Sequence, residues 1–232
     1  MKEQEQKGKS KKRLMMPGTM LNPIPAVLVT SSFGGEKDVM TVAWTGIINS
    51  KPPMTYVSVR KDRYSHRLIQ EGGNFAINLV SEDLIRACDY CGVKSARETD
   101  KFADCGFTLI RADEIEAPLI GEAPINLECR VIEVHEYPSH DMFVAEIVAV
   151  HADEDLFDED GQLSIERADL VAYCHGAYYG IRKKKLGSFG YSVMKAKTRK
   201  RRIKEENQKK RSTKERNQKK RIAKEEKTKK GK

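Results

Sequence analysis

Apolar and β-branched residues occur along the chain in short runs bounded by turn-forming residues, a pattern typical of β-strands. Six runs are expected to be strands: Ala26–Thr30, Val39–Trp44, Met54–Arg60, Asn74–Val80, Ile125–Tyr137 and Met142–Val150. The last two flank a short turn-forming segment, so they predict a long antiparallel hairpin. Long antiparallel strands with few helices between them favour a mainly β fold, a β-barrel with a few short helices, over a doubly wound sheet.

Two stretches between the expected strands predict short helices. Ser65–Gln70 and Leu84–Tyr90 have suitable lengths, with Ser65 and Ser81 as expected N-cap residues. The run Ala168–Cys174 fits a strand or a helix, and its pattern does not decide between them.

A polar segment separates the second and third expected strands. It holds Thr45, Asn49 and Ser50 and is stiffened by Pro52-Pro53, so a loop is expected here. A basic stretch with hydrogen-bonding side chains follows and could bind a phosphate at a helix N-terminus: Arg60, Lys61, Arg63, Ser65 and His66. On the residues alone, a plain strand–turn–strand with solvated basic side chains is the favoured interpretation.

Four segments together resemble one known family. They are Met40–Arg60 with Ser65-His66, Cys91–Phe102, Ala123–Cys129 and His140–Val144. In these segments the chain resembles the flavin reductase-like FMN-binding split-barrel family, specifically its flavoredoxin branch, over about residues 22–191. Ala96 stands where that branch usually has glycine, so this loop lacks the backbone freedom that glycine would give it.

The resemblance implies an FMN site, and its residues are carried over one by one. Thr45, Asn49, Ser50 and Lys51 would line the ribityl chain and the ring edge, while Arg60, Ser65 and His66 would hold the phosphate. Trp44 would lie against the flavin ring and Lys101 would place a cation near its pyrimidine side. His140, from the same chain or from the partner subunit of an expected homodimer, would complete the site. No side chain is expected to be indispensable for proton transfer, so no catalytic residue is predicted.

Each role has a simpler structural alternative. Trp44 could be an ordinary core tryptophan, and His66 could be a surface histidine. Lys101 could pair with Asp100 or Asp104 on a surface helix.

Two functions are consistent with bound FMN. The first is an electron-transfer flavoprotein that works with a redox protein partner, and the flavoredoxin-like segment around Lys101 favours it. The alternative is a flavin reductase that takes hydride from NADH or NADPH and reduces free flavin or a small acceptor. In both roles the chemistry belongs to the flavin.

Charge divides the chain into three parts. We expect a basic disordered leader at 1–16, the split-barrel domain at 17–194, and a basic tail at 195–232 that is disordered or transiently helical. Residues 1–13 carry a net charge of +4 and residues 195–232 a net charge of +15, which leaves −10 for residues 14–194. The tail repeats Lys204–Arg211 as Lys214–Arg221 and lacks the aromatic residues that stack on bases. Nucleic acid is therefore not expected as the primary partner, although a polyanion-binding module without flavin remains a more distant alternative.

Five cysteines suit a reducing compartment better than a disulfide framework. Cys88 and Cys91 form a C-x-x-C motif without a second pair, so no metal site is expected, and the motif is either a redox dithiol or two incidental thiols. No apolar run is long enough to span a bilayer, and the charged N-terminus offers no signal peptide. A cytoplasmic protein is therefore expected.

Overall fold

The computed structural model describes residues 12–181, 185–195, 198, 200 and 201. The chain divides into two units, Met1–Arg182 and Lys183–Lys232. Residues 1–11 of the leader and the repeats at 204–221 lie outside the described residues. The predicted boundaries of the leader and the tail therefore stay predictions.

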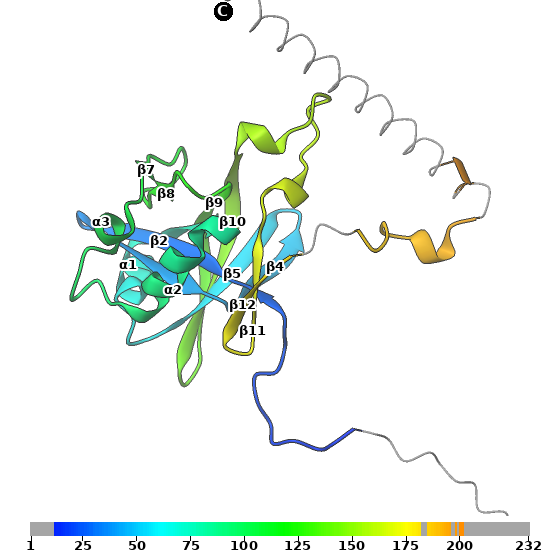
Figure 1. Cartoon of the computed structure of the whole chain (residues 1–232). Coiled ribbons are helices and arrows are strands. Elements are labelled where there is room, and N and C mark those ends of the chain that lie inside the picture. Colours follow the sequence, from blue (N-terminus) through cyan, green and yellow to red (C-terminus); the bar gives the residue numbers. More distant parts are fainter. Residues whose placement is uncertain (1–11, 182–184, 196–197, 199, 202–232) are drawn as a thin grey trace, which may run out of the picture. The chain divides into compact units, whose positions relative to one another are not determined.

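A seven-stranded antiparallel sheet forms the first unit, with the strand order β3-β2-β6-β9-β10-β5-β4 (Figure 1). Its strands are β2 (Val27–Phe33), β3 (Glu36–Val42), β4 (Thr45–Ser50), β5 (Pro53–Arg60), β6 (Asn74–Leu79), β9 (Ile125–Glu136) and β10 (His140–Ala152). Two small sheets accompany it, formed by β1 (Ile24–Pro25), β11 (Val171–Cys174) and β12 (Ala177–Gly180), and by β7 (Leu109–Ile110) and β8 (Leu119–Ile120). The α-helices of this unit are α1 (Tyr64–Gly72), α2 (Ile85–Val93) and α3 (Lys101–Cys105). The predicted mainly β fold is confirmed.

The β9–β10 hairpin also agrees with the sequence, but the segment expected as a loop does not. Thr45–Ser50 is strand β4, which pairs antiparallel with β5 and places Thr45 opposite Val57. The turn lies instead at Lys51-Pro52, because proline cannot donate a hydrogen bond to the ladder. The open prediction for 168–174 resolves as strand β11.

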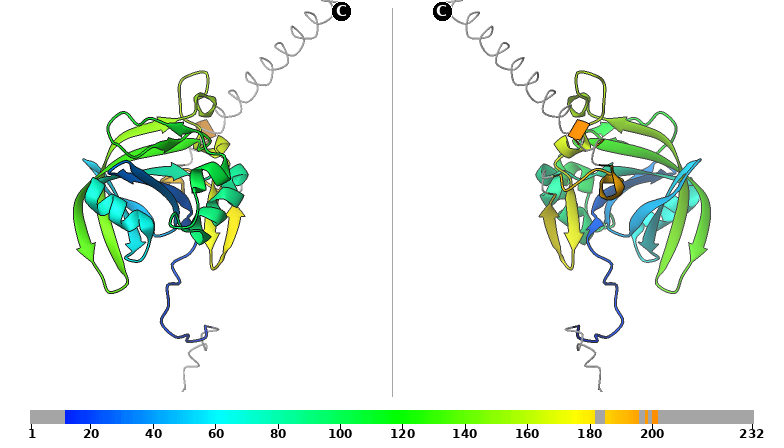
Figure 2. Two further views of the ribbon diagram at one scale, coloured as in Figure 1. Left: turned by 90° about the vertical axis from the view of Figure 1, so that its left-hand side faces the viewer. Right: turned by 90° about the vertical axis from the view of Figure 1, so that its right-hand side faces the viewer.

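Strand β2 is buried on both faces, and a different helix covers each face. Val27 and Val29 point into the barrel, where Ile69 of α1 joins the same apolar cluster. Leu28 points the other way and packs in a second cluster with Cys88 and Cys91 of α2. The two helices therefore flank the strand, as Figure 2 shows, and α2 lies on the outside of the barrel.

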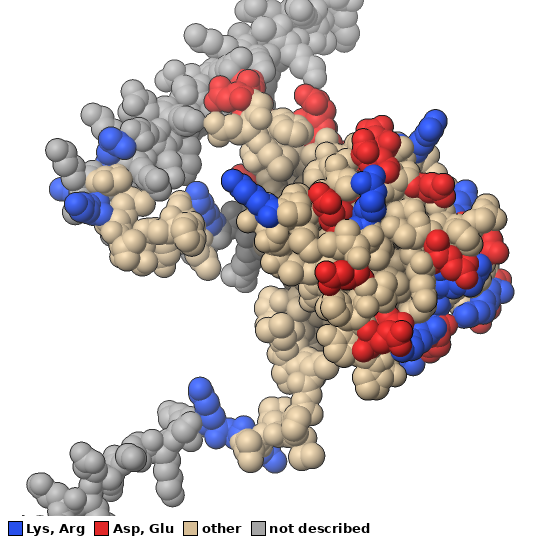
Figure 3. Space-filling model, turned by 180° about the vertical axis from the view of Figure 1, so that it is seen from behind, with Lys and Arg blue, Asp and Glu red and all other residues tan. Residues whose placement is uncertain are grey.

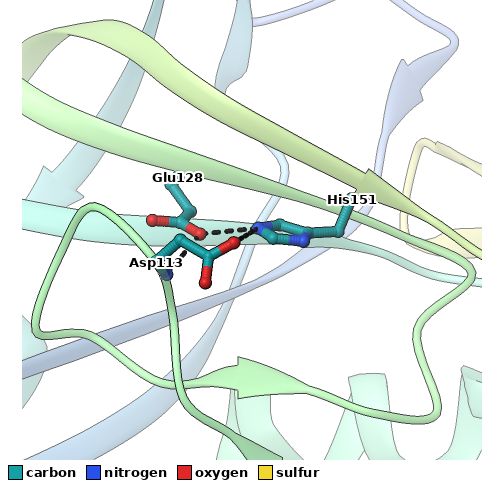
Figure 4. A group of neighbouring side chains, drawn as sticks. All are labelled: Asp113, Glu128 and His151. Atoms are coloured by element: carbon teal, nitrogen blue, oxygen red, sulfur yellow. Dashed lines mark hydrogen bonds and ion pairs between the residues drawn. The ribbon is translucent and has the colours of Figure 1, made fainter.

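Glu128 on β9 holds the loop that contains Asp113 and Glu114 against the sheet (Figure 4). Its side chain is fully buried and accepts hydrogen bonds from the backbone amides of Asp113 (2.9 Å) and Glu114 (2.7 Å). His151 of β10 lies 2.6 Å from the same carboxylate, and Asp113 lies 3.9 Å from His151. These residue types can also bind metals, but the protein's own donors already account for the burial of Glu128.

The surface of the first unit carries charges of both signs. On the face in Figure 3, acidic and basic side chains are interspersed. The acidic excess of residues 14–194 is therefore not gathered into one patch on that face. Among the described residues, no helix is both long and apolar enough to cross a membrane.

Candidate functional site

Two adjoining grooves lie between the end of β3, strand β5 and helix α2. They have volumes of about 400 and 320 Å³ and share Met40, Arg60 and Arg63 in their walls. Such volumes fall within the range of cofactor pockets, about 300–1,000 Å³. The two grooves together therefore form an elongated site whose ends differ in chemistry.

The first groove, which we call the aromatic groove, is lined by Trp44, His140, Tyr173 and Tyr178 among other residues. The backbone carbonyl of Trp44 accepts a hydrogen bond from the amide of Ser58 (2.9 Å), which holds the tryptophan beside β5. The rings of Trp44 and His140 lie 4.6 Å apart at an angle of 32°. Trp44 keeps 42% of its surface exposed, so the alternative of an ordinary core tryptophan does not hold.

His140 is placed in this groove by the register of the sheet. It begins β10 directly opposite Arg60, the last residue of β5. Burial and the nearby charge of Arg60 lower the pKa of His140, so its ring is neutral near pH 7. A neutral imidazole beside an indole provides an aromatic wall for a planar ring system.

The second groove, which we call the basic groove, carries a positive charge. Its walls contain five cations, Arg60, Arg63, Lys94, Arg97 and Lys101, and two carboxylates, Asp38 and Asp62. Arg60 pairs with Asp62 at 3.1 Å, and Arg97 donates to the backbone carbonyl of Asp62. An excess of cations with guanidinium groups suits a phosphate.

Lys101 and Asp38 form a buried ion pair in the wall of the basic groove. Their charged atoms are 2.8 Å apart, and their side chains are only 3% and 2% exposed. Asp38 also accepts from the amide of Val39 (2.7 Å) and from the hydroxyl of Ser65. Asp100 caps α3 through the amides of Phe102 and Ala103, which places Lys101 in its first turn facing β3. The alternative that Lys101 pairs with Asp100 or Asp104 is wrong, because its partner is Asp38.

Ser65 lines the basic groove, but it is not the N-cap residue of helix α1. Helix α1 begins at Tyr64, its N-cap residue is Arg63, and no side chain caps it. The hydroxyl of Ser65 is used to bind Asp38 across the groove wall.

His66 faces the interior, and it lines neither groove. Its ring lies 2.7 Å from a carboxylate oxygen of Asp141 and packs edge-on against Phe143. Burial alone would raise the pKa of Asp141, but hydrogen bonds from His66 and Lys61 hold that pKa below its usual value. His66 is 9% exposed, so it is not a surface histidine. Its partner Asp141 lies opposite Val59, the residue before Arg60 on β5.

Four of the predicted residues lie away from the grooves. Thr45, Asn49 and Ser50 belong to β4, an edge strand of the sheet, and Lys51 follows it in the turn. Thr45 donates to the backbone carbonyl of Tyr56, and Asn49 donates to that of Pro52. Trp44, Arg60, Ser65, Lys101 and His140 therefore line the two grooves, whereas none of the four residues of the β4 region lines either groove.

Several groove residues were not singled out from the sequence. Asp38 and Arg97 line the basic groove, and Tyr173 and Tyr178 line the aromatic groove. The rings of the two tyrosines meet edge to face across the β11–β12 hairpin, with their centroids 5.3 Å apart. Their signal in the sequence was a pair of aromatic residues on both sides of the turn His175-Gly176.

Known proteins share this architecture. The family described as "Flavin reductase like domain" matches residues 20–182. Flavoredoxin of Desulfovibrio vulgaris (Miyazaki F) superposes with a TM-score of 0.73 at 33% identity, covering 78% of this chain and 99% of its own. Flavoredoxin from Methanosarcina acetivorans gives a TM-score of 0.71 at 28% identity, covering 79% of this chain and all of its own.

The chain also has a relative in an archaeon. An uncharacterized protein of Pyrococcus abyssi is 31% identical over 60% of this chain and 80% of its own length. The domain match and the structural likeness cover the same barrel that forms both grooves. This chain belongs to the flavin reductase-like family of split-barrel proteins and has a flavin-related redox function.

Proposed function

We propose that the protein binds FMN across the two grooves and transfers electrons through it. The observation that carries this proposal is the continuity of an aromatic groove with a positively charged groove through Met40, Arg60 and Arg63. FMN has the matching form, a planar ring at one end and a phosphate at the other. When bound, it supplies one-electron and two-electron chemistry that side chains lack.

Within this proposal the residues have separate tasks. Arg60 and Ser65 bind the phosphate, with Arg63 beside them, and His66 holds their support in place through Asp141. Trp44 and His140 contact the ring and exclude water from it. Lys101 adds a cation to the basic groove, which stabilises the negative charge of the bound phosphate.

The test compares FMN with riboflavin, which lacks the phosphate. Arg60→Ala should weaken FMN binding about tenfold or more, because a hydrogen bond to a charged group contributes about 1.5–3 kcal/mol. Riboflavin binding should change little. Arg130→Ala is the matched control, since Arg130 is an exposed arginine outside both grooves. A wild-type protein that takes up no FMN, or an equal loss for both ligands, would contradict the proposal.

The electron-carrier role and the reductase role differ in the electron donor. The carrier is our first proposal, and flavoredoxins are the structural neighbours that support it. One observation favours the reductase: the exposed face of Trp44 leaves the aromatic groove open to a second planar ring such as nicotinamide. Anaerobic stopped-flow mixing with NADH or NADPH separates the two roles. A rapid loss of the oxidised-flavin absorbance supports the reductase, and its absence supports a carrier reduced by a protein partner.

We also propose a homodimer that uses the edge strand β4. Ile47 and Ile48 on this strand are 72% and 49% exposed, and an edge strand with exposed apolar residues is a ready pairing surface. Such a dimer gives Thr45, Asn49, Ser50 and Lys51 a place at a cofactor near the interface. Light scattering should show that Ile47→Lys yields monomers, whereas Ile132→Lys on the inner strand β9 does not. An unchanged mass for Ile47→Lys would exclude β4 as the interface.

The more distant alternative is a polyanion-binding module without flavin. Its basic tail lies outside the described residues, apart from its first few positions. A colourless protein that does not bind added FMN and that binds RNA in a salt-dependent manner would favour this alternative.

A further inference from the structure

Two cysteines from different helices lie next to each other at the wall of the basic groove. The sulfur atoms of Cys91 on α2 and Cys105 at the end of α3 are 3.9 Å apart. Both cysteines are unbridged. Cys91 also lines the basic groove, together with Lys101 at the start of α3.

The C-x-x-C partner, Cys88, fits a disulfide less well. Cys88 and Cys91 lie three residues apart on α2, and side chains at that spacing have Cβ atoms about 5–6 Å apart. A disulfide requires Cβ atoms about 3.5–4.5 Å apart, so this pair would have to distort the helix. The spatial neighbour of Cys91 is Cys105, not Cys88.

We propose that Cys91 and Cys105 form a dithiol–disulfide couple that exchanges with small organic disulfides, and that Cys105 reacts first. Cys105 is partly exposed, whereas Cys91 is 1% exposed. Burial raises the pKa of both thiols, and the deeper burial of Cys91 makes it the slower nucleophile toward an external reagent.

The exchange proceeds in two balanced steps. The Cys105 thiolate attacks one sulfur of the reagent RSSR, which forms a mixed disulfide and releases RS⁻. The Cys91 sulfur then attacks Sγ of Cys105, releases the second RS⁻ and closes the Cys91–Cys105 bond. The two thiol protons pass to the two RS⁻ ions, so the protein dithiol is oxidised and one RSSR is reduced to two RSH.

The cross-link would act on the basic groove. It closes a loop that contains residues 92–104, and this loop carries Lys94, Ser95 and Arg97 in the groove wall. Joining α2 to α3 restricts the movement of that wall and holds Lys101 in place. The consequence for FMN rests on the proposed function: a preorganised groove should release FMN at least threefold more slowly in the oxidised protein.

The full-length protein provides a direct test with 2-hydroxyethyl disulfide as the probe. After oxidation, blocking with N-ethylmaleimide and cleavage by trypsin, mass spectrometry should find the peptide 87–94 joined to the peptide 102–111. Free thiols should fall from five to three, because the chain has five cysteines and two become cross-linked. A peptide 87–94 that loses two hydrogen atoms by itself would assign the bond to Cys88 and Cys91 and overturn the proposal. Five unreacted thiols would overturn it as well.

Variants establish the order of the steps. Cys88→Ser is the matched control and should keep the cross-link. Cys91→Ser should trap the mixed disulfide on Cys105, and Cys105→Ser should leave Cys91 unmodified. If the Cys91→Ser variant fails to fold, the Cys105→Ser variant tests the order of reaction by itself. Probe attached to Cys91 in that variant would contradict the proposal that Cys105 reacts first.

FMN release is measured separately in the reduced and oxidised proteins. Equal rates would contradict the effect on the groove while leaving the cross-link established. Absence of FMN binding in the reduced protein would instead contradict the proposed function.

Discussion

Asp38 and Glu128 are both buried carboxylates, but they belong to regions with different purposes. Glu128 is fully buried and receives two backbone amides from one loop and the ring of His151. Asp38 is 2% exposed and is held by Lys101 and Ser65, which come from α3 and α1. Asp38 lines the basic groove, whereas Glu128 lines neither groove.

The partners of a buried carboxylate therefore indicate whether it serves the stability of the fold or the charge of a binding groove. A carboxylate saturated mainly by backbone amides of one neighbouring loop fixes that loop to the sheet. A carboxylate that joins separate helices at a groove wall also sets the charge that a ligand meets. Changes at Glu128 should therefore alter stability alone, and changes at the Asp38–Lys101 pair should alter both stability and flavin binding.

The largest effect on stability is expected from Glu128→Ala. It leaves the amides of Asp113 and Glu114 and the ring of His151 without their acceptor, and each unsatisfied buried group costs about 1–3 kcal/mol. The free energy of unfolding in urea should fall by about 4 kcal/mol. Glu122→Ala is the matched control, because exposed Glu122 also accepts a backbone amide, from Thr108, and its loss should cost below about 1 kcal/mol. If folded Glu128→Ala binds FMN more weakly than the wild type, Glu128 also serves flavin binding, and its role does not differ from that of Asp38.

Lys101→Met should have the next largest effect, and it should act on both properties. Asp38 keeps its hydrogen bonds but loses the buried cation, so the free energy of unfolding should fall by about 3 kcal/mol. FMN should bind at least about tenfold more weakly, because the groove loses a cation. Lys94→Met is the control for stability: Lys94 is a cation of the same groove but is exposed, so its loss should leave the free energy of unfolding nearly unchanged. Calorimetric titration that shows unchanged FMN affinity in Lys101→Met would place this pair with Glu128 as a purely structural feature.

Acid should destabilise the protein through two carboxylates, Glu128 and Asp141, the second of which pairs with His66. Burial would raise the pKa of each, but the backbone amides and His151 at Glu128, and His66 and Lys61 at Asp141, hold both pKa values below normal. A lowered folded-state pKa stabilises the protein above the unfolded-state pKa of about 4, and this stability is lost as pH falls through the folded value. Urea midpoints should therefore stay flat for these groups from about pH 7 to 5 and decline below about pH 4.

Variants divide that acid response between the two carboxylates. Glu128→Gln and Asp141→Asn should each make the decline shallower than in the wild type. An undiminished slope in both variants would show that other groups control acid unfolding.

The barrel could be predicted from local sequence because its signals are local. The alternating runs and the turn before His140 place the β9–β10 hairpin without knowledge of distant residues. Strand β4 was missed because Gly46 and Asn49 have low strand propensity and Pro52-Pro53 follows the segment. Their strand conformation depends on pairing with β5, which a local pattern does not reveal.

The site was predictable where a motif carried the residue and not where the fold assembled it. Trp44, Arg60 and His140 came from recognised segments, and the structure places them together. Asp38 gave no signal, because its importance arises from Lys101, which lies 63 positions later along the chain. Cys105 gave none for the same reason, since its partner Cys91 is on another helix.

The smallest expected effect comes from Gly92, where α2 forms a wall of the aromatic groove. A Cβ at this position would lie 3.3 Å from the Cβ of Thr41, a tight contact that needs a small shift. Alanine also favours the helix by up to about 1 kcal/mol over glycine, so the net stability of Gly92→Ala should change by less than about 0.5 kcal/mol. FMN affinity should fall several-fold, because the shift moves the groove wall. Gly72→Ala is the contrasting control: its Cβ would lie 2.5 Å from the backbone oxygen of Ser32, away from the grooves, and should cost about 2 kcal/mol without changing FMN affinity. If fluorescence titration shows the same FMN affinity for Gly92→Ala and wild type, the ring does not rest against α2, and its place in the aromatic groove must lie nearer Trp44 and His140.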